Sequence, residues 1–143
     1  MLIGRKLSGR IAQQQRGSVL LEAMIAILIF SMGILAIVGL QAASLKAVSE
    51  SKYRVDASFL ANQVVSDMWV DRNNLASYVW DGSGTAPGAI TTWVGQVQNT
   101  LPGADVNPPT ISVVGSVVTV TVFWQPPREP SAHQFVALAN ISG

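Results

Sequence analysis

The sequence predicts an α+β fold in which one long N-terminal helix is packed by a small antiparallel sheet. Residues 23–45 are mostly apolar and include no charged residue, and apolar residues recur at helical spacing after them. Further along the chain, the β-branched runs Ile111–Val114 and Val117–Trp124 are separated only by Gly115 and Ser116, which is the signal of a compact hairpin. A helix followed by strands is typical of an α+β arrangement.

Charge is distributed unevenly along the chain. The 143 residues have a mean hydropathy of +0.37 and only 12% charged residues, unlike an ordinary soluble domain. Four basic residues precede Gly17 with no acid among them: Arg5, Lys6, Arg10 and Arg16. From Ser18 onward, five basic residues stand against eight acidic ones, a net charge of −3, which argues against nucleic-acid binding. There is no cysteine, so disulfides, thiolate catalysis and thiolate metal sites are excluded.

The charge-free run is long enough to span a membrane. A helix of about 23 residues, rising about 1.5 Å per residue, covers about 34 Å, against a hydrocarbon core of about 30 Å. Basic residues before the run, and none after it until Lys46, predict a cytoplasmic N-terminus and an external C-terminal part. A cleaved secretory signal is the alternative, but residues 40–43 make a weak cleavage site because Leu40 or Gln41 would occupy the outer position.

Glu22 stands out because it lies near the start of the apolar helix. An ionised carboxylate within a membrane is costly, so it is expected to have a partner, and no cation lies within residues 19–24. Two simpler interpretations of Glu22 remain open. Glu22 lies at the headgroup boundary, or it interacts favourably with the positive end of the helix dipole.

The residues around Glu22 resemble a known processing signal. Gly17-Ser18-Val19-Leu20-Leu21-Glu22, after a basic leader and before an apolar helix, is similar to the class III signal of type IV prepilins and of type II secretion pseudopilins. The resemblance implies that a prepilin peptidase cleaves after Gly17 and methylates the new amine of Ser18. It also implies that Glu22 pairs with the N-terminal amine of a neighbouring subunit, which makes it an assembly residue. Ser18 and Val19 differ from the phenylalanine and threonine common in major pilins.

A narrower resemblance points to the PilV group of minor pilins. It rests on the leader, on residues 26–35 and 39–41, and on Asp67-Met68 followed by Arg72, so it covers residues 17–72. This group implies roles in priming pilus assembly, in surface motility and in presenting an adhesin. The implied fold is the pilin lollipop, divided into a leader (1–17), a transmembrane and assembly half of the helix (18–45) and a periplasmic head (46–143).

The helix is expected to continue to about Asp71, because no proline interrupts it. A core-facing stripe is predicted on this second half, consisting of Val48, Val55, Phe59, Leu60, Val64 and Met68. Residues 81–88 are rich in glycine and other turn formers and are predicted to be a loop without the spacing of a nucleotide-binding motif.

A short amphipathic helix follows the loop and is stopped by Pro102-Gly103. Its apolar positions are Ile90, Trp93, Val94, Val97 and Leu101. After the hairpin and a proline-containing break, a last strand is expected over His133–Ile141, which gives a sheet of about three or four strands.

No catalytic constellation emerges from the head, and neither a cofactor nor a metal site is expected. His133 is the sole histidine, so a usual zinc set cannot be completed. Asp67 and Asp71 are four residues apart, which is typical of a solvated helix face. No serine lies in a Gly-x-Ser-x-Gly elbow. The tryptophans at 69, 80, 93 and 124 suit either a core or an interface, and the sequence does not distinguish them.

Four functional hypotheses follow. The first is a minor pilin of a type IV pilus, which is not an enzyme; the second is a minor pseudopilin of a type II secretion system. The third is a membrane-anchored periplasmic enzyme or binding module, and the fourth is a secreted protein. The first implies other major and minor pilins, the prepilin peptidase, an inner-membrane assembly platform and a tip adhesin as partners. Its location would be the inner membrane before assembly and the cell surface afterwards.

Overall fold

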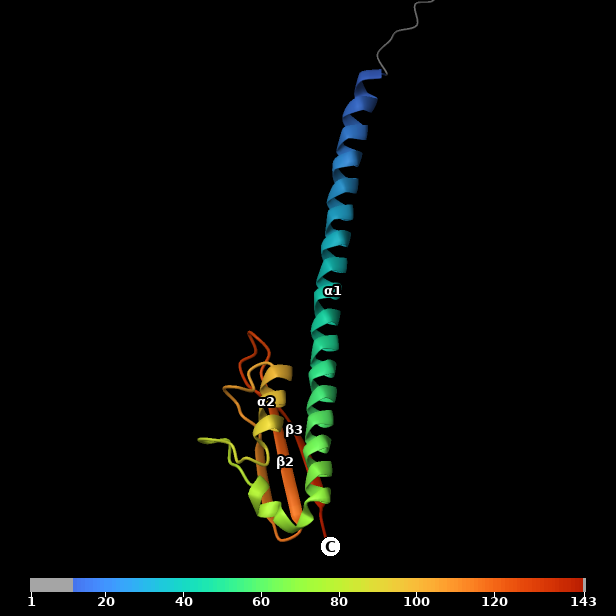
Figure 1. The fold of residues 1–143 in the computed structure, drawn as a ribbon. Helices are drawn as coiled ribbons and strands as arrows, with labels where there is room; N and C mark the ends of the chain where they lie inside the picture. The colour runs from blue at the N-terminus through green and yellow to red at the C-terminus, as the bar shows by residue number, and fades with distance from the viewer. Residues whose placement is uncertain (1–11, 143) are drawn as a thin grey trace, which may run out of the picture. The chain divides into compact units, whose positions relative to one another are not determined.

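The computed structural model describes residues 12–142 of the chain, with side chains from residue 17 to 142. Helix α1 spans Ala12–Val70, 59 residues (Figure 1). The predicted single helix is therefore confirmed, and it ends one residue before the predicted end at about Asp71. Arg5, Lys6 and Arg10 of the expected leader lie outside the described residues, as does the side chain of Arg16.

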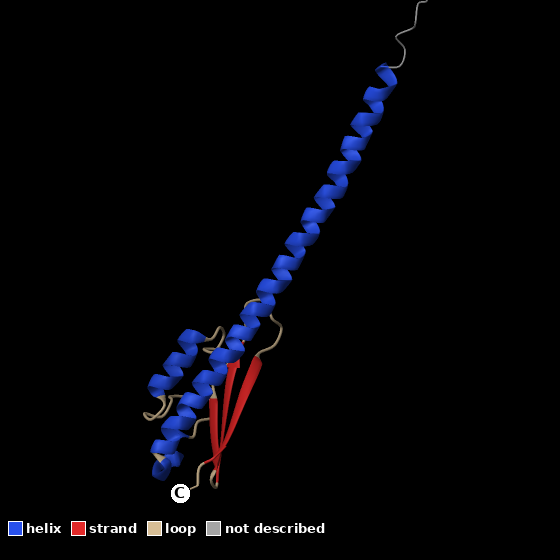
Figure 2. Ribbon diagram, turned by 90° about the vertical axis from the view of Figure 1, so that its right-hand side faces the viewer, coloured by secondary structure: helices blue, strands red, loops and turns tan. Residues whose placement is uncertain are grey.

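The chain forms two compact units, one up to Lys46 and one from Ala47 onward. After α1, the second unit contains a 3₁₀ helix, η1 (Arg72–Tyr78), and helix α2 (Thr91–Thr100). Three strands follow: β1 (Thr110–Val114), β2 (Val117–Trp124) and β3 (His133–Asn140). They form one antiparallel sheet in the order β1-β2-β3, and Figure 2 shows the strands running side by side. The α+β prediction of a long apolar helix with a small antiparallel sheet is confirmed.

The β1–β2 hairpin depends on a two-residue loop. Val114 pairs with Val117, and only Gly115 and Ser116 lie between them. Gly115 has φ 62°, a value that glycine adopts without the steric strain of a Cβ atom. Glycine with positive φ at the first central position is the requirement of a type II′ turn, whose twist matches that of the flanking strands. The hairpin predicted from these two residues is thus formed.

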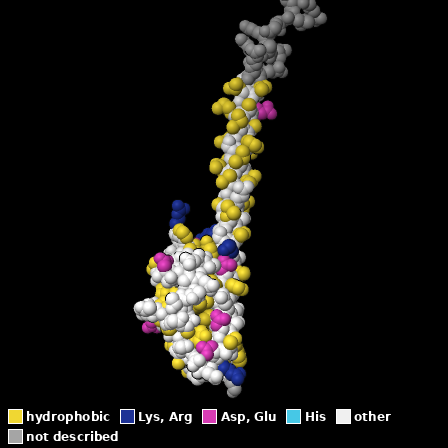
Figure 3. Space-filling view, viewed as in Figure 1, with side chains coloured by type: hydrophobic (Ala, Val, Ile, Leu, Met, Phe, Trp, Pro, Cys, Tyr) yellow, Lys and Arg dark blue, Asp and Glu magenta, His cyan; other side chains and the backbone are white. Residues whose placement is uncertain are grey.

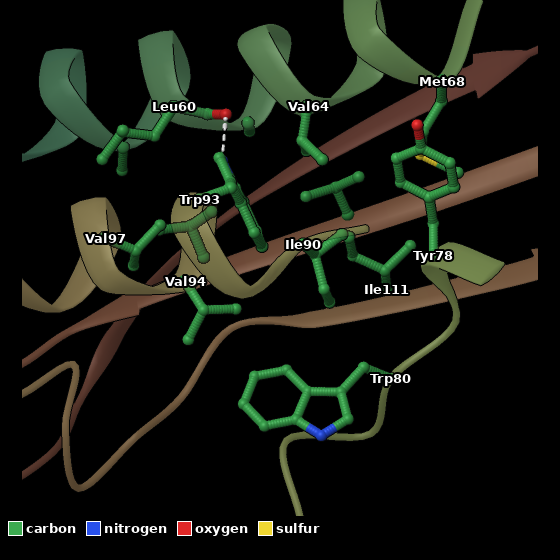
Figure 4. Close-up of a cluster of buried hydrophobic side chains, with 14 of the residues drawn as sticks. Leu60, Val64, Met68, Tyr78, Trp80, Ile90, Trp93, Val94, Val97 and Ile111 are labelled. Carbon is green, nitrogen blue, oxygen red and sulfur yellow. Dashed lines mark hydrogen bonds between the residues drawn. The ribbon is translucent and has the colours of Figure 1, made fainter. Parts of the chain in front are cut away.

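The core of the second unit joins α1, α2, η1 and the inner face of the sheet. Leu60, Val64 and Met68 of α1 are 4%, 1% and 0% exposed, and Figure 4 shows them facing side chains from α2 and the sheet. On β2 every second side chain is buried, as expected for a strand with one face on a core. All five apolar positions predicted for the short helix are buried: Ile90, Trp93, Val94, Val97 and Leu101.

Part of the predicted core stripe on α1 was wrong. Val48, Val55 and Phe59 are 67%, 65% and 68% exposed. At 3.6 residues per turn these three share one side of the helix, whereas the buried residues lie on the opposite side. Small residues, Ala57 and Ala61, complete the true core face, and both are fully buried. The side of α1 opposite the core therefore has exposed apolar side chains that the second unit leaves uncovered.

Candidate functional site

The predicted processing and assembly residues all lie near the start of α1, within the first unit. Gly17 and Ser18 are helical and exposed, and a Cβ atom added at Gly17 would meet no atom within 4 Å. Glu22 follows Ser18 by one helical turn, so the two side chains lie on the same face. The structure thus brings Ser18 and Glu22 together along the helix.

The surroundings of Glu22 are apolar and open. Leu20, Leu21 and Met24 beside it are 67%, 61% and 62% exposed. Among the side chains that the structure describes, none forms an ion pair or hydrogen bond with Glu22. A single carboxylate therefore lies in a long segment whose other described side chains, up to Leu45, are uncharged.

The apolar part of α1 could span a membrane by its length and composition. It is the one helix with this property in the described part of the chain, and its most apolar window is 0% buried. Figure 3 shows hydrophobic side chains along the visible face of this segment. The core helix of a soluble protein would be mostly covered by its own chain, whereas these side chains are exposed to whatever surrounds the helix.

A second exposed apolar surface lies on the second unit. We call it the outer stripe: Val48, Val55 and Phe59, on the side of α1 opposite the core. Phe59 also borders an open groove of about 340 Å³ between α1 and α2. The other residues along the groove are Asp56, Leu60, Gln63, Gln96 and Thr100. Because large apolar side chains rarely cluster uncovered on a monomer, the outer stripe is a candidate contact surface.

Polar contacts near the outer stripe are weak and solvent-exposed. Lys52 Nζ donates to Asp56 Oδ2 at 2.7 Å, and this hydrogen bond raises the pKa of the Lys52 amine above its ordinary value. Gln63 Nε2 donates to Gln96 Oε1 at 3.3 Å, which links α1 to α2 across the groove. Exposed pairs of this kind are screened by solvent and contribute little to stability.

His133 joins β3 to α1. Its Nδ1 lies 3.3 Å from Oε1 of Glu50, an ion pair when the imidazole is protonated. Its ring stacks on Trp124 with centroids 5.7 Å apart and planes 19° apart. Within the described residues, no group of three or more histidine, aspartate or glutamate side chains is placed to hold a metal ion.

Asp71, the residue that follows α1, is the centre of a polar cluster. Its Oδ1 accepts a hydrogen bond from Asn74 Nδ2 at 2.6 Å, and its Oδ2 accepts one from the Tyr78 hydroxyl at 3.4 Å. Burial of Tyr78, and next the nearby charge of Asp71, raise the pKa of the Tyr78 hydroxyl above its ordinary value. Asp71 thus has a structural role in fixing η1, beyond the solvated face predicted for Asp67 and Asp71.

The tryptophans divide clearly between core and surface. Trp80, Trp93 and Trp124 are 8%, 4% and 1% exposed, whereas Trp69 is 45% exposed. The indole N–H of Trp93 donates to the Leu60 carbonyl at 2.8 Å and so connects α2 to α1 (Figure 4). Trp69 is thus the tryptophan that is available for an interface.

Sequence reasoning missed the two faces of α1 and the His133–Glu50 contact. Apolar spacing alone does not say which of two stripes faces the core, but the alanines at 57 and 61 were a usable signal, since small residues permit close packing of a helix on a sheet.

Comparisons with protein-family models, curated proteins and solved structures find no match to the chain.

Proposed function

We propose that this protein is a minor pilin of a type IV pilus, processed after Gly17 and assembled through α1. The observation that carries the proposal is the lone carboxylate of Glu22, five residues after a Gly17 cleavage signal, on a continuous and exposed apolar helix. In this role Glu22 of an incoming subunit pairs with the amine at Ser18 of a neighbour. The role is structural and requires no bound cofactor.

The physical chemistry of Glu22 favours such a partner. A carboxylate among apolar helices, or a free amine among them, costs several kcal/mol when it is buried alone. Pairing the two groups offsets part of this cost. In any other axial register both groups would be buried without a partner. One charge pair therefore selects one register, which apolar contacts alone, being non-directional, do not.

The outer stripe extends the proposed assembly surface into the second unit. Val48, Val55 and Phe59 remain exposed after the head has packed its own core on the other side of α1. In a filament of related subunits, this side of α1 would face neighbouring helices. Burial of one such side chain contributes about 1.5 to 3 kcal/mol.

The processing step is tested by mass spectrometry of the N-terminal peptide. The protein is isolated from its own membrane, in cells with and without the prepilin peptidase. We expect a peptide that begins at methylated Ser18, present only with the peptidase. A start near Ala43, or an uncleaved Met1, would overturn the proposal and support a secreted or simply anchored protein.

The assembly step is tested with Glu22→Gln, which removes the charge and keeps the shape of the side chain. Asp67→Asn is the matched control, because it neutralises an exposed carboxylate elsewhere on the same helix. We expect the first variant to be cleaved normally but to enter filaments at about a tenth of the normal level or less, since a lost ion pair worth about 1.4 kcal/mol changes an equilibrium tenfold. Normal incorporation of the Glu22→Gln variant into filaments would contradict the assembly role proposed for Glu22.

A further inference from the structure

The two edges of the sheet differ in their backbone pairing. At the β1 edge, the Trp80 N–H donates to the Ile111 carbonyl at 3.0 Å, and the Ile111 N–H donates back to Trp80 at 2.8 Å. This bridge caps β1. Beyond β3, on the side away from β2, no strand of the described chain is paired. The sheet therefore has one capped edge and one open edge.

The register identifies which backbone groups lie at the open edge. The Ile141 N–H donates to the Ser116 carbonyl at 2.7 Å, so residue 141 is directed toward the β2 side. Because hydrogen bonding alternates along an antiparallel strand, odd-numbered residues of β3 bond to β2 and even-numbered residues face away. The residues with outward N–H and C=O groups are Gln134, Val136, Leu138 and Asn140.

β3 has none of the features that usually protect an edge strand. Such strands are kept from pairing by charges, by proline, by bulges or by short length. β3 is eight residues long, includes no Asp, Glu, Lys, Arg or Pro, and pairs with β2 without a bulge. Val136 and Leu138, which face away from the core, are 43% and 71% exposed.

The core itself is incomplete at this edge. Val118, Val120 and Val122 on the inner face of β2 are each 0% exposed. Their partners across the ladder, Ala139, Ala137 and Phe135, are only half-buried although they face the same core. One further strand beside β3 would cover these inner side chains and, on the outer face, Val136 and Leu138.

We propose that the open edge of β3 is a docking site for an extended, uncharged strand of another polypeptide, which adds as the fourth strand of the sheet. Main-chain donors and acceptors in a row require an extended backbone as partner. Val136 and Leu138 are exposed and apolar, and β3 contains no Asp, Glu, Lys or Arg, which favours a strand with apolar or hydroxyl side chains. A second copy is disfavoured because residues 47–143 carry four basic and seven acidic residues, a net charge of −3 on each copy. The site is independent of the proposed pilin role.

The test uses the full-length protein in detergent micelles and two synthetic peptides. The probe is a nine-residue peptide of alternating threonine and valine, and its control has proline at every second position and so lacks the N–H groups. We expect the probe, but not the control, to slow amide exchange at residues 134, 136, 138 and 140 by about tenfold or more at saturation, as expected for newly hydrogen-bonded edge amides. Amide exchange is followed residue by residue with nuclear magnetic resonance.

Two variants locate the binding at this edge. Leu138→Pro removes an N–H that faces away from β2, so the ladder within the sheet is kept while the edge is blocked. Val136→Lys places a charge beside the added strand, and Val114→Lys is its control, because Val114 is also an exposed valine on the outer face, 77% exposed, but on capped β1. Leu138→Pro and Val136→Lys should lose the protection, and Val114→Lys should keep it.

Three results would overturn the proposal. The first is that the probe gives no protection, or the same protection as the proline control. The second is that Val136→Lys binds the probe as well as the unmodified protein does. The third is that the four amides are already protected without peptide and lose protection on dilution, which would make a second copy the occupant of the edge.

Discussion

Replacement of Trp93 by phenylalanine tests how α2 is held against α1. The Trp93 side chain is 4% exposed, and its indole N–H donates to the Leu60 carbonyl at 2.8 Å. Phenylalanine removes this hydrogen bond, worth about 1 kcal/mol, and leaves part of the indole volume empty, at a further cost of about 1 kcal/mol. We therefore expect Trp93→Phe to lower the free energy of unfolding of the second unit by about 2 kcal/mol.

The assay is thermal unfolding of the full-length protein in micelles, followed by near-ultraviolet circular dichroism. For a unit of this size, 2 kcal/mol corresponds to a decrease in Tm of about 10 °C. Trp69→Phe is the matched control: Trp69 is 45% exposed, and its replacement should change the stability by less than about 0.5 kcal/mol. Equal effects of the two substitutions, or a loss below about 0.5 kcal/mol for Trp93→Phe, would refute the assignment of Trp93 as the link between the helices.

Two further predictions concern backbone strain and alkaline pH. Gly103 has φ 69°, and a Cβ atom there would lie 2.9 Å from the Gln125 carbonyl oxygen. Gly103→Ala should therefore lower the free energy of unfolding by about 2 kcal/mol or more. Gly88 has open space around it, so Gly88→Ala should not lower it, and denaturant unfolding measures both variants. The raised pKa of Tyr78 means that the unfolded chain loses the hydroxyl proton first, so the stability due to this group is complete below pH 10.0 and is lost as pH rises toward the folded-state pKa. Unfolding measured at a series of alkaline pH values should show that Tyr78→Phe lacks this loss of stability. The same dependence of the unfolding free energy on pH in both proteins would contradict the prediction.

Elements with a local signal could be predicted from the sequence. The unbroken apolar and amphipathic run predicted α1, and Gly115-Ser116 between β-branched runs predicted the hairpin. The 3₁₀ helix η1 was not predicted, because it is held by Asn74 and Tyr78 bonding to Asp71, contacts that no periodicity indicates. These contacts depend on how the chain returns after α1.

Residue environments that depend on distant segments were predicted less well. Phe59 and Leu60 are neighbours in sequence, yet one is 68% and the other 4% exposed, because only the packing of the sheet decides which side of α1 is covered. The burial of Trp80, Trp93 and Trp124 against the exposure of Trp69 has the same origin. The assignment of Gly17, Ser18 and Glu22 as processing and assembly residues stays a prediction, since it rests on the sequence motif.

The capping of β1 by Trp80 has a consequence for the order in which the second unit folds. The hairpin β1–β2 closes over two residues, whereas the Trp80–Ile111 bridge and the Trp93–Leu60 bond each join positions about 30 residues apart in the chain. Closing longer loops costs more chain entropy, so the hairpin is expected to form early and the docking of α1 late. Until α1 docks, the apolar inner face of the sheet is uncovered, and the nascent chain is then most exposed to proteases and to aggregation.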